Sequence, residues 1–172
     1  MVSGRRILTY TPAGRREVQD IIQGIFVAEL LRPSGELWIV SPWISDISVI
    51  NDATGRFKFL HDSGLTRVRL STALGSVTKL GGRVSIVTRP TDNEPMIAKL
   101  RAIQETAGEA FRIVLRESLH AKGIAGDGYA ITGSMNLTWS GTAKWDEFVE
   151  LRTGTAAADV RSRFREAYAT SP

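Results

Sequence analysis

Short apolar runs alternate with amphipathic stretches over the first two thirds of the chain, and this alternation restricts the possible folds strongly. Residues 17–31 place apolar side chains at helical spacing, and Pro33 and Gly35 end that pattern. Helical patterns recur over 67–80 and 92–108, and strand-like runs occupy 36–41, 83–89 and 111–116. Such an alternation predicts an α/β fold, in which helices cover both faces of a mixed sheet.

The last third of the chain has shorter patterns. Residues 119–125 and 128–133 predict two strands joined by a turn at 126–128, and residues 148–152 predict another strand. A helix is expected over 156–168, with Arg161, Arg163 and Arg165 on a solvated face. Residues 51–66 have turn chemistry and no period, so we expect an irregular connection that contains His61 as a surface residue.

The length of 172 residues fits one domain, and the first residues differ from the rest in charge. Residues 1–16 contain Arg5, Arg6, Arg15 and Arg16 and no carboxylate, and they precede the first helical pattern. We therefore expect a basic N-terminal arm over 1–16, able to lie on a nucleic-acid backbone, and a single domain over 17–172.

Composition excludes several kinds of site. The chain has no cysteine, which rules out disulfides, iron–sulfur clusters and cysteine nucleophiles, and its two histidines argue against a histidine-built metal centre. We expect no metal and no cofactor. No apolar run is long enough to span a bilayer, and the first residues lack the hydrophobic stretch of a signal peptide, so we expect a cytoplasmic protein without a membrane partner.

The cations are mostly arginine. The net charge is +4, and 17 of the 22 basic residues are arginine. A guanidinium group binds two phosphate oxygens at once, so this bias suits a phosphate-rich partner. A GC-rich genome produces the same bias and explains it equally well.

Residues 120–136 hold the side chains of a phosphate site. His120 and Lys122 lie two residues apart on a predicted strand and therefore share one face of the sheet. The next strand returns to a turn where Gly133 allows close approach, and Ser134 and Asn136 supply hydrogen-bond donors. An imidazole, a fixed cation and two neutral donors at one point describe a site that binds and attacks a phosphate.

This pattern resembles the signature of the phospholipase D superfamily, which has His-x-Lys, four residues, Asp, and then Gly-Ser-x-Asn. Here five residues separate Asp127 from Gly133, where the usual pattern has six. A one-residue change within a strand would turn its side chains to the other face, so we expect the tight turn at 126–128 to absorb the difference. We assign supporting roles to Asp127, as a cap of that turn, and to Gly133.

The resemblance also implies an acid that orients the histidine, commonly 11 residues after the asparagine. Glu147 lies at this spacing from Asn136, and Glu150 is the alternative if the loop is longer. The implied reaction begins with attack of His120 on phosphorus to give a phosphohistidine. A second histidine protonates the leaving oxygen and then activates water.

One His-x-Lys motif supplies only half of such a site. His61 is followed by Asp62 and Ser63 and has no lysine two positions on, so it does not form a second motif. The resemblance therefore implies that a second copy of the chain provides the other histidine across a two-fold axis, in a homodimer.

A closer likeness involves the segments AELLRPSGELWIVSPWISDI and GSMNLTWSG. Both are similar to DpdK-like proteins, small phospholipase D-like proteins that accompany bacterial clusters for 7-deazapurine DNA modification and restriction. This likeness implies a metal-independent phosphodiesterase acting on DNA, as a nuclease or nuclease subunit of a defence complex with other subunits.

Two other functions stay open: a hydrolase of phospholipids or small phosphodiesters, and a non-catalytic DNA-binding or scaffold subunit. Trp43 and Trp139 fit packing in the core better than stacking on bases or on a partner chain.

Overall fold

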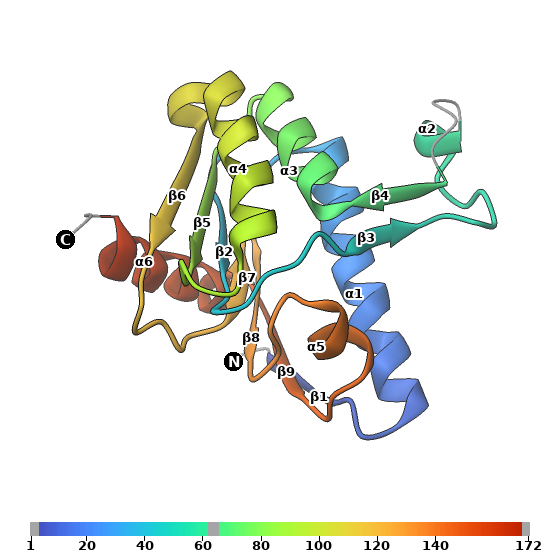
Figure 1. Cartoon of the computed structure of the whole chain (residues 1–172). Coiled ribbons are helices and arrows are strands. Elements are labelled where there is room, and N and C mark those ends of the chain that lie inside the picture. Colours follow the sequence, from blue (N-terminus) through green and yellow to red (C-terminus); the bar gives the residue numbers. More distant parts are fainter. Residues whose placement is uncertain (1–3, 62–65, 170–172) are drawn as a thin grey trace.

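Seven strands form one mixed sheet at the centre of the protein (Figure 1). Their spatial order is β1 (Gly4–Leu8), β9 (Phe148–Thr153), β8 (Tyr129–Gly133), β7 (Gly123–Ala125), β2 (Leu37–Val40), β5 (Val84–Thr88) and β6 (Phe111–Leu115). Strands β2, β5 and β6 are parallel, and the other neighbouring pairs are antiparallel. This computed structural model describes residues 4–61 and 66–169, without the side chains of Phe59 and His61. The predicted α/β fold with a mixed sheet is confirmed.

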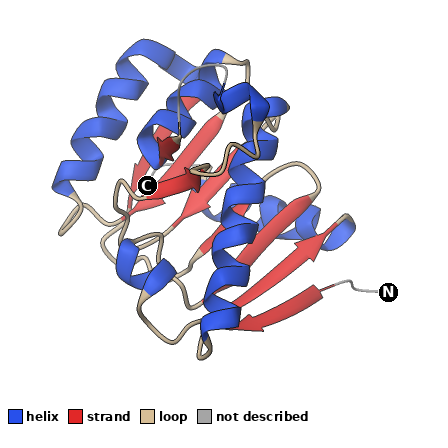
Figure 2. Ribbon diagram, turned by 90° about the vertical axis from the view of Figure 1, so that its right-hand side faces the viewer, coloured by secondary structure: helices blue, strands red, loops and turns tan. Residues whose placement is uncertain are grey.

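Helices cover both faces of the sheet, which explains why every residue of β2 is buried. Leu37 and Ile39 face the core beneath α1 (Pro12–Leu31), α3 (Leu70–Lys79) and α4 (Glu94–Ala107). Trp38 and Val40 face α6 (Thr155–Tyr168) on the other side. Figure 2 shows α1 crossing in front of the strands. No helix of the described residues is long and apolar enough to cross a membrane.

The N-terminal segment differs from the expected arm. Residues 4–8 form β1, an edge strand that pairs antiparallel with β9, and Ile7 is its buried residue. Helix α1 begins at Pro12, because the Thr11 side chain accepts a hydrogen bond from the Gly14 amide at 3.1 Å and caps the helix. Residues 4–8 thus lie in the sheet and residues 12–16 in the first helix, and the division of the chain at residue 16 stays a prediction.

The region predicted as an irregular connection contains regular structure. β3 (Ser48–Asn51) pairs antiparallel with β4 (Arg67–Arg69) in a two-stranded ribbon outside the main sheet, and α2 (Lys58–His61) lies between them in the chain. Because β4 takes the first residues of the predicted helix 67–80, α3 begins only at Leu70. The prediction for the His61 side chain lies outside the described residues.

The other predicted elements are present within a few residues. The structure adds the short 3₁₀-helix η1 (Gly108–Ala110) and the short helix α5 (Trp139–Ala143). Thr138 caps α5 by accepting a hydrogen bond from the Gly141 amide at 3.0 Å. A helix of five residues is too short to show a helical period in the sequence, which explains why α5 was not predicted.

Candidate active site

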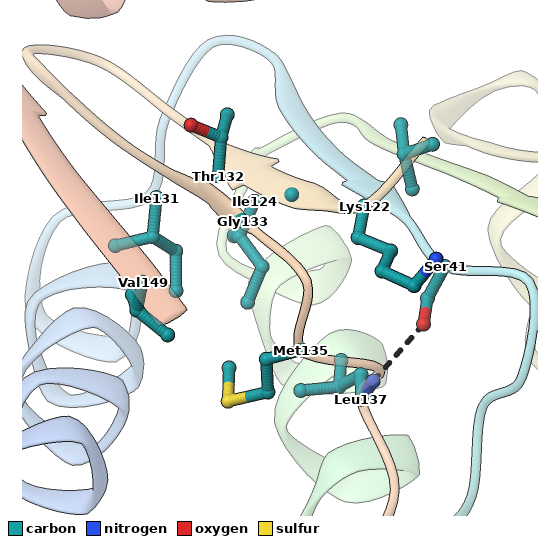
Figure 3. Close-up of a pocket in the computed structure, with 11 residues that line it drawn as sticks. Ser41, Lys122, Ile124, Ile131, Thr132, Gly133, Met135, Leu137 and Val149 are labelled. Atoms are coloured by element: carbon teal, nitrogen blue, oxygen red, sulfur yellow. Dashed lines mark hydrogen bonds between the residues drawn. The ribbon is translucent and has the colours of Figure 1, made fainter. Parts of the chain in front are cut away.

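The ends of four neighbouring strands bring distant parts of the chain to one edge of the sheet. Val40 at the end of β2 pairs with Gly123 at the start of β7, and Gly123 pairs with Thr132 near the end of β8. Gly133 then pairs with Val149 near the start of β9. This edge therefore collects residues 40–41, 120–123, 133–137 and 147–149, and a small pocket opens among them (Figure 3).

His120 and Lys122 precede β7 instead of lying within the predicted strand 119–125. The His120 backbone carbonyl accepts a hydrogen bond from the Lys122 ammonium at 2.8 Å. The His120 side chain is exposed, and its ring makes no hydrogen bond to the described part of the chain. The imidazole is therefore accessible to a substrate and to a second protein chain.

Opposing effects act on the pKa of the Lys122 ammonium. Burial lowers its pKa, the nearby Glu147 carboxylate opposes this change, and the Arg89 guanidinium lowers the pKa further. Lys122 also lines the pocket together with Ser41, Met135 and Leu137 (Figure 3). Its charge is thus placed at the site at an energetic cost, as expected for a cation that binds an anion.

Arg89 is a second cation that the sequence analysis missed. It follows β5 directly, and its Nε donates a hydrogen bond to the Leu119 carbonyl at 2.9 Å, next to His120. Its guanidinium carbon lies 4.7 Å from the ring centroid of Trp43. The available signal was its position at the carboxyl end of a predicted parallel strand, where ligand-binding loops often lie.

Ser134 and Glu147 are in direct contact. The Ser134 hydroxyl donates a hydrogen bond to the Glu147 carboxylate and accepts one from the Phe148 amide at 3.0 Å. The buried Thr9, which the sequence analysis also missed, fixes Glu147. The Thr9 hydroxyl accepts from the Glu147 amide at 2.6 Å, and the Thr9 amide donates to the Glu147 carbonyl at 2.9 Å.

The structure separates the two candidate acids. Glu147 contacts Ser134 and interacts electrostatically with Lys122, whereas Glu150 lies within β9 and pairs with Arg152 at 2.9 Å. Glu147 is therefore the acid at this edge, and its carboxylate is hydrogen-bonded to Ser134 rather than to His120.

Gly133 and Asn136 complete the edge. A Cβ atom at Gly133 would lie 2.0 Å from the Phe148 carbonyl oxygen, so only glycine permits this approach of β8 to β9. The Asn136 side-chain oxygen is buried and has no hydrogen-bond partner among the described residues. An unpaired buried oxygen is costly, and because it is an acceptor it needs a donor such as an N–H or O–H group; an ionised phosphate oxygen does not satisfy it.

Asp127 lies at the opposite end of β7 and β8. Its carboxylate accepts a hydrogen bond from the Gly35 amide at 2.9 Å and pairs with Arg161. Its own amide donates to the Ser34 hydroxyl at 2.8 Å. Asp127 therefore fastens the β7–β8 turn to the loop before β2 and to α6, and it is not in contact with the groups around His120.

The predicted nucleic-acid contacts near the N-terminus are partly occupied. Arg5 pairs with Glu17 at 2.6 Å, and Arg15 pairs with Asp146 at 3.0 Å and donates to the Thr9 carbonyl at 2.8 Å. Arg6 is exposed on β1, and Arg16 lines a shallow surface groove with Arg5. Binding of nucleic acid by these arginines stays a prediction.

Two tryptophans do not pack in the core, contrary to expectation. The exposed fraction is 36% for Trp43 and 65% for Trp139. Trp43 follows β2 at the candidate site, and Trp139 begins α5. The expectation failed because both residues lie in loops or short elements at the sheet edge, where the surrounding chain does not cover an indole ring.

The mixed sheet, with a histidine and two cations at one edge, defines an α/β protein whose edge presents groups able to bind an anion. The chain belongs to the phospholipase D-like family: residues 47–168 match the family described as the phospholipase D-like domain of cardiolipin synthase. The superfamily resemblance seen in the sequence is thereby confirmed. No curated protein matches the chain significantly.

Solved structures share this fold across nearly the whole chain. The phospholipase D family member Nuc from Salmonella typhimurium is 16% identical, with a TM-score of 0.58 over 96% of this chain and 93% of that one. NucT from Helicobacter pylori is 14% identical, with a TM-score of 0.59 over 95% of each chain. Polyphosphate kinase from Porphyromonas gingivalis is 15% identical, with a TM-score of 0.62 over 99% of this chain but only 26% of that chain.

Proposed function

We propose that the protein is a metal-independent phosphodiesterase that cleaves DNA through a phosphohistidine intermediate. The observation that carries this proposal is that His120, with an exposed side chain, lies at one edge of the sheet with two cations, since Lys122 bonds to the His120 carbonyl and Arg89 to the adjacent Leu119 carbonyl. Membership of the phospholipase D-like family supports the same chemistry.

The reaction has two steps. A ring nitrogen of His120 forms a bond to phosphorus while the bond from phosphorus to the leaving oxygen breaks, and a second imidazole gives that oxygen a proton. Water then attacks phosphorus, passes a proton to the second imidazole, and releases His120. Lys122 and Arg89 stabilise the negative charge that develops on the non-bridging oxygens, so the chain itself supplies the cations of the transition state.

The second imidazole comes from a second copy of the chain in this proposal. The sequence has one other histidine, His61, and it lacks the lysine that accompanies His120. His120 is exposed at the sheet edge, where a partner chain can approach it. A homodimer with both His120 rings at one phosphate then completes the site.

We infer DNA as the substrate from the charge of the chain and from sequence likeness. Arginine makes up 17 of the 22 basic residues, and guanidinium groups suit a polyphosphate backbone. The likeness of residues 28–47 and 133–141 to DpdK-like proteins supports a role as a nuclease or nuclease subunit of a cytoplasmic DNA modification or restriction system. The basic residues of segment 1–16 are proposed to contribute to DNA binding.

Cleavage of labelled DNA in excess EDTA tests the proposal. The wild-type protein is expected to cleave, and His120→Ala is expected to lower the rate by about 10³-fold or more, because the nucleophile is lost. His61→Ala, which removes the other histidine, serves as the matched control and is expected to keep the activity. A requirement for magnesium, or full activity of His120→Ala, would contradict the mechanism.

Two further arms of the experiment address the alternatives. Turnover of phospholipid vesicles in place of DNA would favour a lipid hydrolase. Salt-sensitive DNA binding without any cleavage would favour a non-catalytic DNA-binding subunit.

A further inference from the structure

A groove beside the candidate active site has an aromatic lining. Trp43 and Trp145 line it, together with Asn136, whose buried oxygen is unpaired at the edge described above. Ser45, Asp92 and Thr138 add polar groups to the same groove. Because Asn136 belongs to both places, the groove adjoins the candidate active site. We call this region the tryptophan groove.

Both indole rings of the tryptophan groove are open to solvent. The exposed fraction is 36% for Trp43 and 55% for Trp145. A cation accompanies each ring, since the Arg89 guanidinium lies 4.7 Å from the centroid of Trp43 and the Lys144 ammonium lies 5.2 Å from that of Trp145. Solvent-exposed aromatic rings interleaved with cations are the arrangement that binds single-stranded nucleic acids.

The loops that carry one wall of the groove are held in place by Asn93, which is buried. Its side-chain amide donates to the Pro42 carbonyl at 2.8 Å and to the Arg89 carbonyl at 3.0 Å, and its oxygen accepts from the Ile44 amide at 2.8 Å. One side chain thus joins the loop after β2 to the loop after β5. The tryptophan groove is therefore built before any ligand arrives.

Asp92 in this wall has a strained backbone. Its φ angle is 65°, the only positive value for a non-glycine residue in the described part of the chain. Such a conformation persists where surrounding contacts impose it, and it often occurs at binding sites. The Asp92 amide donates a hydrogen bond to the Glu94 carboxylate at 3.3 Å, and the Asp92 carboxylate, a hydrogen-bond acceptor, belongs to a residue that lines the groove.

We propose that the tryptophan groove binds a nucleobase next to the phosphate that is cleaved, and that the substrate is therefore single-stranded or locally unpaired. This inference rests on the proposed function, because it takes the phosphate of a nucleic acid to lie at His120. A base offers a flat face to an indole ring and donors on its edge to Asp92, Ser45 or Thr138. In a duplex both faces of each base are already stacked, so a duplex does not fill the groove.

Binding to a protein that cannot cleave tests the inference. In a His120→Ala background, affinity is measured by fluorescence anisotropy for a short single strand, for its duplex, and for an abasic strand with the same phosphates. The single strand is expected to bind about 10-fold more tightly than the abasic strand, in line with the stacking of one base. The duplex is expected to bind no better than the abasic strand.

Single substitutions show which side chains cause the preference for the normal strand over the abasic strand. Trp43→Ala and Trp145→Ala are each expected to reduce affinity for the normal strand toward that of the abasic strand, whereas Trp43→Phe keeps a ring and retains most of the preference. Trp139→Ala removes an indole that is more exposed than either of these but does not line the tryptophan groove, and it is expected to change nothing. Thermal melts confirm that each variant is folded.

Three results would overturn the inference: equal affinity for normal and abasic strands, equal affinity for the duplex, or dissociation of a dimer in the tryptophan variants. The last result would make the groove an interface between copies. These outcomes are distinct from failure of the proposed function. If wild-type protein cleaves abasic and normal strands at equal rates and His120→Ala does not cleave, the phosphodiesterase stands and the nucleobase site falls.

Discussion

At the scale of single residues, Lys122 carries a charge that its surroundings disfavour. Burial lowers its pKa, and Arg89 lowers it further against the opposing effect of Glu147. The ammonium therefore loses its proton at a lower pH than an ordinary lysine, whose pKa is 10.5. If the ammonium stabilises the transition state, activity falls as the pH rises through this lowered value.

The variant Lys122→Arg tests this dependence, because a guanidinium group stays protonated throughout the alkaline range. In profiles of kcat/KM against pH, measured in EDTA, we expect the alkaline limb of the wild type to lie below pH 10.5 and that of Lys122→Arg to move to higher pH or disappear. Lys79→Arg, a change at an exposed lysine on α3, is the control. Identical alkaline limbs for wild type and Lys122→Arg would show that Lys122 does not set the limb.

The sequence was most informative about the site at the level of single residues. The motif predicted His120, Lys122, Ser134 and Asn136, and the structure brings their segments to one edge. Arg89 was missed although it follows a predicted parallel strand, and Thr9 was missed because nothing near it in the sequence marks it. They reach the site only because β5 and β1 end at the edge of the sheet where β8 ends and β9 begins.

At the scale of elements, two glycines, one in a strand and one in a helix, have opposite structural demands. Gly133 ends β8, where a Cβ atom would lie 2.0 Å from the Phe148 carbonyl oxygen. Gly24 lies on the exposed side of α1, where a Cβ atom would meet nothing within 4 Å. Gly133 is required because two strands approach each other closely there. Gly24 has no such role, and it only increases the backbone entropy of the unfolded chain.

Chemical denaturation of two alanine variants tests this contrast. Gly133→Ala is expected to lower the free energy of unfolding by about 2 to 4 kcal/mol, because β8 and β9 must separate to accept the methyl group. Gly24→Ala is expected to raise it by about 0.5 to 1 kcal/mol. Unchanged stability in Gly133→Ala would mean that the two strands do not approach as the structure shows.

Elements were predictable where one periodic pattern filled one segment. β2, β5, β6 and α4 were predicted for this reason, since each is bounded by glycine, proline or polar residues. β1 was missed because Ile7 is its single buried residue, and one apolar side chain makes no alternation. The β3–β4 ribbon was missed because residues 48–51 pair with 67–69 across a long connection, which no local pattern reveals.

At the scale of the whole molecule, the proposed chemistry needs two imidazoles at one phosphate, whereas the chain provides a single His-x-Lys motif. A nucleophile that is bonded to phosphorus cannot also protonate the leaving oxygen. If two copies share one site, the loss of His120 from either copy removes the whole site. If each copy instead had an independent site, the copy that keeps His120 would keep its activity.

Mixed dimers distinguish these cases. Wild-type and His120→Ala chains with different affinity tags are produced together, and dimers that carry both tags are isolated in two purification steps. We expect such dimers to have almost no EDTA-resistant nuclease activity, whereas independent sites would leave about half. A dimer of two wild-type chains with the same two tags is the control for the tags and the purification. Half activity in the mixed dimer, or full activity in a protein that sediments as a monomer, would show that one chain holds a complete site, and the general acid would then have to be sought among the other residues around His120.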